Sequence, residues 1–214
     1  MCSFFQNKET GISIFKKLKK NFDGKFEVEV SDVLNKIKIS PTNKVITVKR
    51  TSDNEYSIFE SNWGIQFDKV KKSPLIYNSR IETIKEKKYW NNIFKRNRCL
   101  LPATGFFEWK EINKTKIPHL IRLKNEELFF IPSIFINMDG KEHTSMVTTE
   151  PNIFMKSIHN RMPVILETEN SLKYLSGSPE EAMQYCIPYP ECENMSVEIA
   201  EEILTEKQKK AIES

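Results

Sequence analysis

The sequence has few of the residues that cross-link a chain or bind a metal: 4 cysteines and 3 histidines among 214 residues. It also has only 6 glycines, so with 10 prolines it does not have a collagen-like or low-complexity composition. No Cys-x-x-Cys pair occurs, and Cys186 and Cys192 are separated by a spacing that zinc sites rarely use. We therefore predict free thiols in a reducing compartment, no metal site and no cofactor.

Long apolar runs are absent as well. The segment Phe129–Ile136 is far too short to cross a bilayer and is interrupted by Pro132. Near the N-terminus, Lys8 and Glu9 occur before any apolar run develops, so we expect no signal peptide and a cytoplasmic protein without membrane contact. The net charge of +4 permits a polyanionic partner without requiring one. Lysine-rich clusters lie at 16–20, 69–72, 85–88 and 95–98, and a solvated helix face or turn is the better explanation of each one taken singly.

Enough apolar residues are present to build one core: hydrophobic residues make up 39% and aromatic residues 11% of the chain. Periodicity predicts helices over 9–22, 83–95, 151–157, 170–176, 179–186 and 205–214. It predicts strands over 26–30, 44–49, 55–60, 99–109, 117–123, 128–136, 143–149 and 161–166. Because helices and strands do not alternate regularly, we predict a single α+β domain over 1–214, with a largely antiparallel, barrel-like sheet and flanking helices.

Cys2 is the first candidate for chemistry. If Met1 is removed, Cys2 carries an α-amine and a thiol on adjacent carbons. An α-amine with a pKa of about 7.7–8.0 is partly neutral near pH 7 and can form a Schiff base with an aldehyde. The thiol can then close a thiazolidine ring. A cysteine at position 2 can also be accidental, so it needs support from other segments.

Three further segments contain residues suited to this chemistry. In 78–82, Asn78 could orient the terminal amine and Arg80 could hold a phosphate, although a turn followed by a helix start at Glu82 is an equal alternative. Glu108 lies within an aromatic strand, where desolvation would raise its pKa; an exposed strand face is the alternative. His159 precedes an apolar strand and could shuttle protons, whereas His119 and His143 are expected to be structural.

These segments, Met1-Cys2, Asn78–Glu82, Arg98–Lys110 and Ile158–Leu166, together resemble the SRAP family of SOS response-associated peptidases, or abasic site processing proteins. The resemblance is best over 1–175, and the C-terminal part, 190–214, diverges. It implies the compact, barrel-like α+β fold of that family.

The resemblance also implies the roles of the candidate catalytic residues. Cys2 is expected to crosslink to DNA, and Asn78 to position the N-terminus. Glu108 is expected to be the acid and base for opening the sugar ring and for crosslink reversal. His159 is expected to assist Schiff-base formation and proton transfer.

Four other residues match positions that contact DNA in the family. Arg80 and Arg161 correspond to arginines that grip phosphates, and Thr148 to a threonine that contacts the DNA backbone. Pro41 corresponds to the proline of a loop that lies against a base. The implied partner is single-stranded DNA with abasic sites, bound by a monomer that joins the nucleoid after DNA damage, in the SOS response.

The chain departs from the family pattern at the DNA-binding periphery. It begins Cys2-Ser3-Phe4 where the family has Cys-Gly-Arg, and it has Lys38-Ile39-Ser40-Pro41 where the family has Asn-Val-Ala-Pro. The segment Ile65–Asp68 lacks the proline and the base-stacking tryptophan of the family. Because stacking contributes about 1–3 kcal/mol per base, we expect weaker DNA affinity or a different strand geometry, unless Phe67 or nearby lysines compensate.

Three functions follow as hypotheses. The first is sensing of abasic sites and covalent capture of single-stranded abasic DNA through a thiazolidine at Cys2, a lyase-like activity. The second is a cysteine-type peptidase, a hydrolase that removes its own Met1, with His159 as the base. The third is a DNA-binding domain without catalysis.

Overall fold

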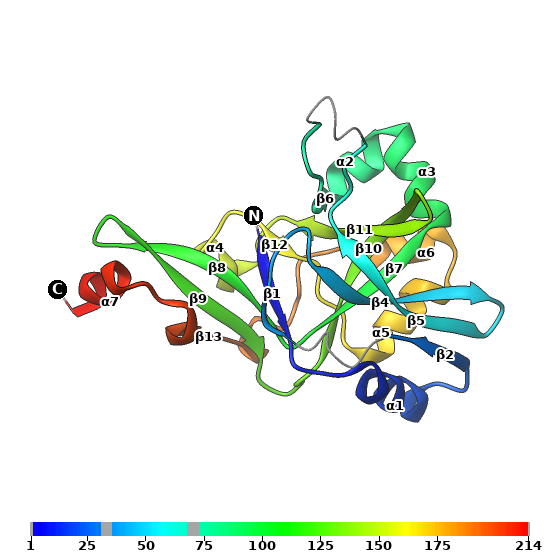
Figure 1. Cartoon of the computed structure of the whole chain (residues 1–214), viewed down its shortest axis with the longest axis horizontal. Coiled ribbons are helices and arrows are strands. Elements are labelled where there is room, and N and C mark those ends of the chain that lie inside the picture. The colour runs from blue at the N-terminus through cyan, green and yellow to red at the C-terminus, as the bar shows by residue number, and fades with distance from the viewer. Residues whose placement is uncertain (1, 31–35, 68–72, 214) are drawn as a thin grey trace.

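Strands occupy the centre of the molecule and helices lie on its outside in the computed structural model, which describes residues 2–30, 36–67 and 73–213 (Figure 1). The strands are β1 (Phe4–Asn7), β2 (Lys25–Glu29), β3 (Lys36–Ile39), β4 (Lys44–Ser52), β5 (Glu55–Trp63), β6 (Asn78–Arg80), β7 (Arg98–Ala103), β8 (Gly105–Ile112), β9 (Thr115–Leu123), β10 (Phe129–Met138), β11 (Lys141–Thr149), β12 (Met162–Pro163) and β13 (Met195–Ile199). The α-helices are α1 (Gly11–Asn21), α2 (Ile81–Glu86), α3 (Lys88–Arg96), α4 (Ile153–Lys156), α5 (Thr168–Ser176), α6 (Pro179–Gln184) and α7 (Glu206–Glu213), and two short 3-10 helices are η2 (Cys192–Asn194) and η3 (Glu201–Ile203).

Two sheets share the strands. One has the order β13-β9-β8-β1-β3 and is antiparallel throughout. The other has the order β12-β11-β10-β7-β4-β5-β2, and a parallel pairing of β11 with β5, at His143 opposite Asn62, closes five of its strands into a barrel. The predicted α+β class with a largely antiparallel, barrel-like sheet is therefore confirmed.

Alternating residues divide each barrel strand between two apolar clusters. In β7, Leu100 belongs to the outer cluster, which α1, α5 and α6 cover. Leu101 belongs to the inner cluster, which also contains Trp63 at the end of β5. The inner cluster extends to Phe5 of β1, whose ring lies 5.0 Å from that of Trp63, and so to the start of the chain.

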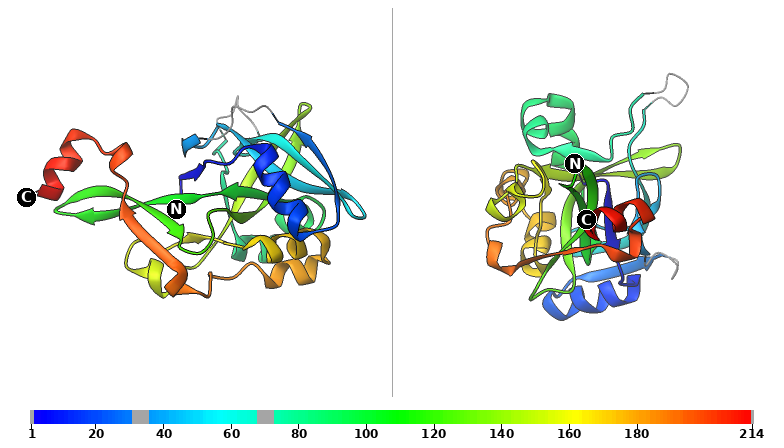
Figure 2. Two further views of the ribbon diagram at one scale, coloured as in Figure 1. Left: turned by 90° about the horizontal axis from the view of Figure 1, so that it is seen from below. Right: turned by 90° about the vertical axis from the view of Figure 1, so that its left-hand side faces the viewer.

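Two of the helices that cover the barrel, α1 and α6, begin at side-chain caps. The Thr10 hydroxyl accepts from the backbone N–H of Ser13 at 3.1 Å and starts α1. Ser178 and Glu181 form a reciprocal capping box at the start of α6. Figure 2 shows α7 and the C-terminus set apart from these helices, beside the β8–β9 hairpin. No helix in the described part of the chain is long and apolar enough to span a membrane.

The structure corrects three predicted elements. The helix expected over 83–95 is divided at Lys87, whose extended backbone separates α2 from α3. The strand expected over 99–109 is divided at Thr104, which bonds to Gln6 where the chain passes from one sheet to the other. The strand expected over 161–166 is regular only at Met162–Pro163. The short strands β1, β3, β6 and β13 were not predicted, because they contain too few residues to show a period.

Candidate active site

Cys2 lies completely buried, two residues before β1 begins at Phe4. Pairing of Phe4 with Phe107 places the first residues of the chain along β8, which also carries Glu108. The Cys2 Sγ donates a hydrogen bond to the backbone oxygen of Phe4 at 3.3 Å. Burial raises the pKa of the Cys2 thiol well above its ordinary value, and the neighbouring Glu108 carboxylate raises it further.

Asn78 holds the backbone of Cys2 by a hydrogen bond. It is brought there by β6, which runs parallel to β11 with Asn78 opposite Met146. Its Nδ2 donates to the Cys2 carbonyl oxygen at 2.7 Å. Its Oδ1 is buried and has no hydrogen-bond partner among the residues that the structure describes. One end of the amide therefore fixes Cys2, and the other is an acceptor available to a donor such as an amine.

Glu108 is a buried carboxyl group, with only 2% of its surface exposed. Burial raises its pKa to about 7. Within the described part of the chain its Oε1 has no hydrogen-bond partner, while its Oε2 lies 3.9 Å from the Nε2 of His159. Near neutral pH this group can both give and take a proton, as an acid/base catalyst must.

His159 lies in the turn after α4, where its backbone N–H donates to Met155 O at 2.9 Å. Its Nδ1 accepts from the backbone N–H of Arg161 at 3.1 Å and lies 3.3 Å from the carbonyl oxygen of the same residue. Partial burial lowers the pKa of the imidazole. A neutral ring with Nδ1 as acceptor carries its proton on Nε2, the atom nearest Glu108.

Three of the four residues expected to contact DNA, Arg80, Thr148 and Arg161, adjoin one another. Arg80 is exposed at the end of β6, and its neighbour across the strands is the buried Thr148. Arg161 contacts Thr148 and makes a two-point ion pair with Glu82, at 2.9 and 3.0 Å. Pro41 is partly buried in the turn between β3 and β4. The DNA contacts of all four stay predictions.

Two features occupy positions where the sequence departs from the family. Lys38 places its ammonium 4.5 Å from the ring centroid of Phe4, so a cation stands beside the position where the family has arginine. Phe67 is 48% exposed, and its ring centroid lies 5.8 Å from that of Tyr89 and 6.1 Å from that of Trp90. The lysines expected to assist it, at 69–72, lie outside the described residues.

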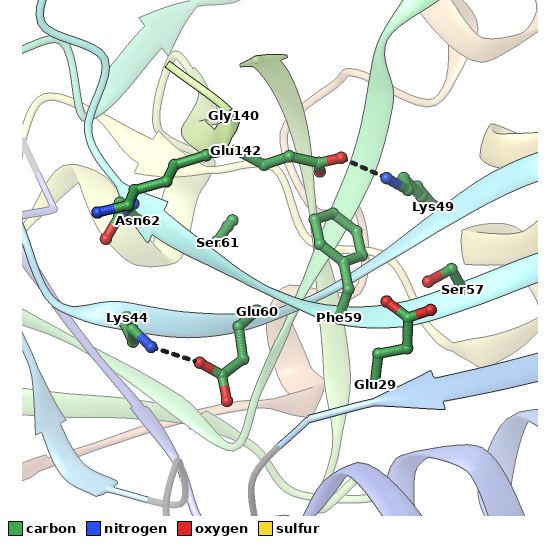
Figure 3. A pocket seen from close by; sticks show the side chains of 11 residues that line it. Glu29, Lys44, Lys49, Ser57, Phe59, Glu60, Ser61, Asn62, Gly140 and Glu142 are labelled. Atoms are coloured by element: carbon green, nitrogen blue, oxygen red, sulfur yellow. Dashed lines mark hydrogen bonds and ion pairs between the residues drawn. The ribbon is translucent and has the colours of Figure 1, made fainter. Parts of the chain in front are cut away.

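A cavity of about 520 Å³ lies away from these residues, between β2, β4, β5 and the β10–β11 turn (Figure 3). Ion pairs of Lys49 with Glu142 and of Lys44 with Glu60 border it, and Lys49 also lies 4.2 Å from the ring centroid of Phe59. None of the predicted site residues lines this cavity. It is therefore separate from the candidate active site.

The other histidines have backbone partners: Nδ1 of His119 bonds Ile117 O, two positions away, and Nδ1 of His143 bonds Gly64 O, far away in the sequence, both at 2.9 Å. Within 2–30, 36–67 and 73–213, no three His, Cys, Asp or Glu side chains group as metal ligands. Sequence reasoning treated Glu82 only as a helix start, and its pairing with Arg161 was missed because 79 positions separate the two residues.

The chain is similar to known proteins. A family model described as SOS response associated peptidase (SRAP) matches residues 1–205. Among similar proteins are two from Bacillus subtilis: the abasic site processing protein YoaM, 32% identical over 71% of this chain and 71% of its own, and YoqW, 33% identical over 64% and 65%. The abasic site processing protein HMCES of Xenopus tropicalis is 26% identical over 58% of this chain and 46% of its own.

The fold has counterparts among crystal structures. A protein from Bacteroides thetaiotaomicron superposes with a TM-score of 0.74 at 23% identity, covering 92% of this chain and 91% of its own. A phage-related protein from Bordetella bronchiseptica gives a TM-score of 0.72 at 19% identity, covering 93% and 94%. At these identities the likeness shows the fold alone.

Proposed function

Because this chain belongs to the SRAP family, we propose that it processes abasic sites by capturing their aldehyde covalently at Cys2. The observation that carries the proposal is the convergence of four groups that are far apart in the sequence. Asn78 bonds the backbone of Cys2 at 2.7 Å, and the Glu108 carboxyl acts on the Cys2 thiol and lies 3.9 Å from His159. The names of the relatives YoaM, YoqW and HMCES point to the same substrate.

Two changes must precede capture: the amine of Cys2 must be freed, and the sugar ring must open. Removal of Met1 frees the α-amine of Cys2, and Asn78 Oδ1 is a buried acceptor that can receive one of its hydrogens. The abasic sugar is mostly a closed hemiacetal, so the ring must open. Glu108 gives a proton to the ring oxygen, the bond between C1 and that oxygen breaks, and the C1 hydroxyl proton passes to water, which leaves the aldehyde. A carboxyl with a pKa of about 7 is suited to donating and recovering this proton near neutral pH.

The covalent steps that follow need no oxidant or reductant. The amine nitrogen attacks the aldehyde carbon, and the resulting carbinolamine loses one water to give an imine. The thiol adds across the C=N bond: sulfur bonds to carbon and the proton passes to nitrogen. His159, neutral and with Nε2 toward Glu108, can carry protons between these steps.

The electrostatics of Cys2 favour this sequence over peptide hydrolysis. A cysteine peptidase needs a thiolate, which forms near neutral pH when a neighbouring cation or imidazolium lowers the pKa of the thiol. Burial and Glu108 instead raise the pKa of the Cys2 thiol. A thiol that stays protonated is a poor nucleophile for an amide, whereas an imine carbon is a stronger electrophile and can be attacked by a weaker nucleophile.

DNA binding in this proposal uses exposed basic and aromatic side chains. Arg80 ends β6 beside Thr148, and Lys38 stands over Phe4 near the start of the chain. Phe67 and Tyr89, 48% and 55% exposed, offer ring faces for unpaired bases. We therefore infer a preference for single-stranded DNA, bound by a monomer acting in the cytoplasm on damaged nucleoid DNA.

A crosslinking assay tests the proposal. The purified protein is mixed with matched abasic and intact single-stranded oligonucleotides and resolved on a denaturing gel. We expect an adduct with the abasic strand only, lost in Cys2→Ala and retained in Cys192→Ala, which removes a different thiol. Equal binding of both strands without an adduct would favour a non-catalytic DNA-binding domain. Release of a peptide from a model substrate by wild type but not by Cys2→Ala would favour the peptidase.

A further inference from the structure

A salt bridge links the two parts of the chain that flank the proposed site. Glu82 lies in the first turn of α2, two residues after Arg80. Arg161 lies two residues after His159. Both terminal nitrogens of the Arg161 guanidinium bond the Glu82 carboxylate, at 2.9 and 3.0 Å, in the two-point geometry that gives arginine–carboxylate pairs their directionality.

Arg161 has a second anchor. Its Nη2 also donates to the backbone oxygen of Thr148 in β11, at 2.8 Å. Only 13% of the Arg161 side chain is exposed, against 48% for Glu82. The guanidinium lowers the pKa of the Glu82 carboxyl, which therefore stays ionised around neutral pH. Both terminal nitrogens, which a phosphate would use, are therefore already bonded to the Glu82 carboxylate.

The backbone of Arg161 in turn holds the imidazole of His159. The backbone N–H of Arg161 lies 3.1 Å from His159 Nδ1 and can donate to it when the ring is neutral. The carbonyl oxygen of Arg161 lies 3.3 Å from the same atom and can accept from it when the ring is protonated. The backbone of one residue can thus support His159 before and after the ring takes up a proton. Other charged groups act on the ring as well: Glu108 from β8 and Lys116 from β9.

We propose that Glu82 and Arg161 form a clamp that positions His159 for proton exchange with Glu108. The inference rests on the proposed function. It gives Arg161 a task different from the phosphate contact that the family resemblance implies, and it makes Glu82 and Arg161 positioning residues that do not touch the reacting atoms. Without the clamp, the turn that carries His159 loses its tie to β11 and α2, and with it the orientation of Nε2.

The test variant is Glu82→Gln, with Glu198→Gln as the matched control. Glu198 also pairs with an arginine, Arg122, but does so on the β9–β13 pair away from the site. Single-turnover rates of adduct formation with an abasic single strand are measured between pH 5.5 and 9. Affinity is measured separately, at several salt concentrations, with a strand that contains a non-reactive tetrahydrofuran site.

We expect Glu82→Gln to slow adduct formation between about tenfold and a hundredfold, as a small misplacement of a catalytic group does. The pH profile should change shape, while affinity for the tetrahydrofuran strand stays within twofold of wild type and Glu198→Gln behaves like wild type. A wild-type rate and profile for Glu82→Gln would overturn the proposal. So would tighter binding with a steeper salt dependence, because that would reveal Arg161 as a phosphate contact that Glu82 masks.

Nuclear magnetic resonance of the histidine rings tests the clamp without any DNA. The chain has 3 histidines, so the His159 signals can be assigned with a His159→Gln sample. In wild type we expect the neutral ring to carry its proton on Nε2, and in Glu82→Gln to show a mixture of tautomers and a changed pKa. Unchanged signals would overturn the clamp. Failure of wild type to form any adduct would overturn the proposed function instead.

Discussion

Replacing Glu108 with glutamine should stabilise the folded protein at alkaline pH. The side chain is 2% exposed, and burial raises its pKa from 4.5 to about 7. A carboxyl whose pKa is higher in the folded state favours folding while it is protonated. That contribution is complete below pH 4.5 and is lost as the pH rises through 7. Glutamine has nearly the shape of the protonated carboxyl and does not ionise.

The magnitude follows from the pKa difference. At 1.36 kcal/mol per pKa unit, a rise from 4.5 to about 7 corresponds to about 3 kcal/mol of unfolding free energy. For a chain of 214 residues this is a rise in Tm of roughly 6–12 °C. The gain should be nearly complete at pH 8 and small at pH 4.5. Residues that lower the stability of the folded protein in this way are often ones that catalysis requires.

Thermal and urea unfolding of Glu108→Gln at pH 4.5, 6 and 8 measure this effect. Glu111→Gln is the matched control, because Glu111 lies on the same strand but is exposed. We expect the control to follow wild type at every pH. Equal stability of Glu108→Gln and wild type at pH 8, or a gain that does not depend on pH, would refute the reasoning that a buried, ionisable carboxyl lies in this site.

Three further predictions concern the reaction and the DNA. The rate of adduct formation should rise with pH as the amine loses its proton and fall above about pH 7 as Glu108 ionises; a Glu108→Gln profile that keeps the falling limb would assign it to another group. Lys38→Glu should weaken single-strand binding and lower the salt slope by about 0.7 or more, as removal of one phosphate contact does, and an unchanged slope would place Lys38 outside the DNA path. Tyr89→Ala should reduce affinity by about 1–3 kcal/mol in binding titrations while leaving the saturated crosslinking rate intact; a slower saturated rate would contradict a purely stacking contribution.

The main elements of the fold could be predicted from sequence because their periods are long and regular. The amphipathic stripe of α1 and the apolar runs of β10 and β11 are examples. Short strands such as β1 and β6 could not, because their pairing is determined by partners distant in the chain. These two strands carry or adjoin Cys2 and Asn78, so residue patterns alone could not show that the site is assembled.

The candidate residues themselves were predicted through the family resemblance, with Glu108 also marked by its aromatic surroundings. The structure places Cys2, Asn78, Glu108 and His159 together, as that prediction requires. The Glu82 partner of Arg161 was not predicted, since neither residue shows in the sequence which long-range contact it makes. Desolvation of Glu108 likewise depends on the packing of two sheets.

Peptide mapping of the crosslinked protein tests the central claim most directly. After reaction with an abasic single strand, nuclease and protease digestion and mass spectrometry, we predict an N-terminal peptide that lacks Met1. It should carry the sugar remnant at Cys2, with a mass increase equal to the remnant less one water. A remnant on a lysine, or on a peptide that still contains Met1, would contradict the account.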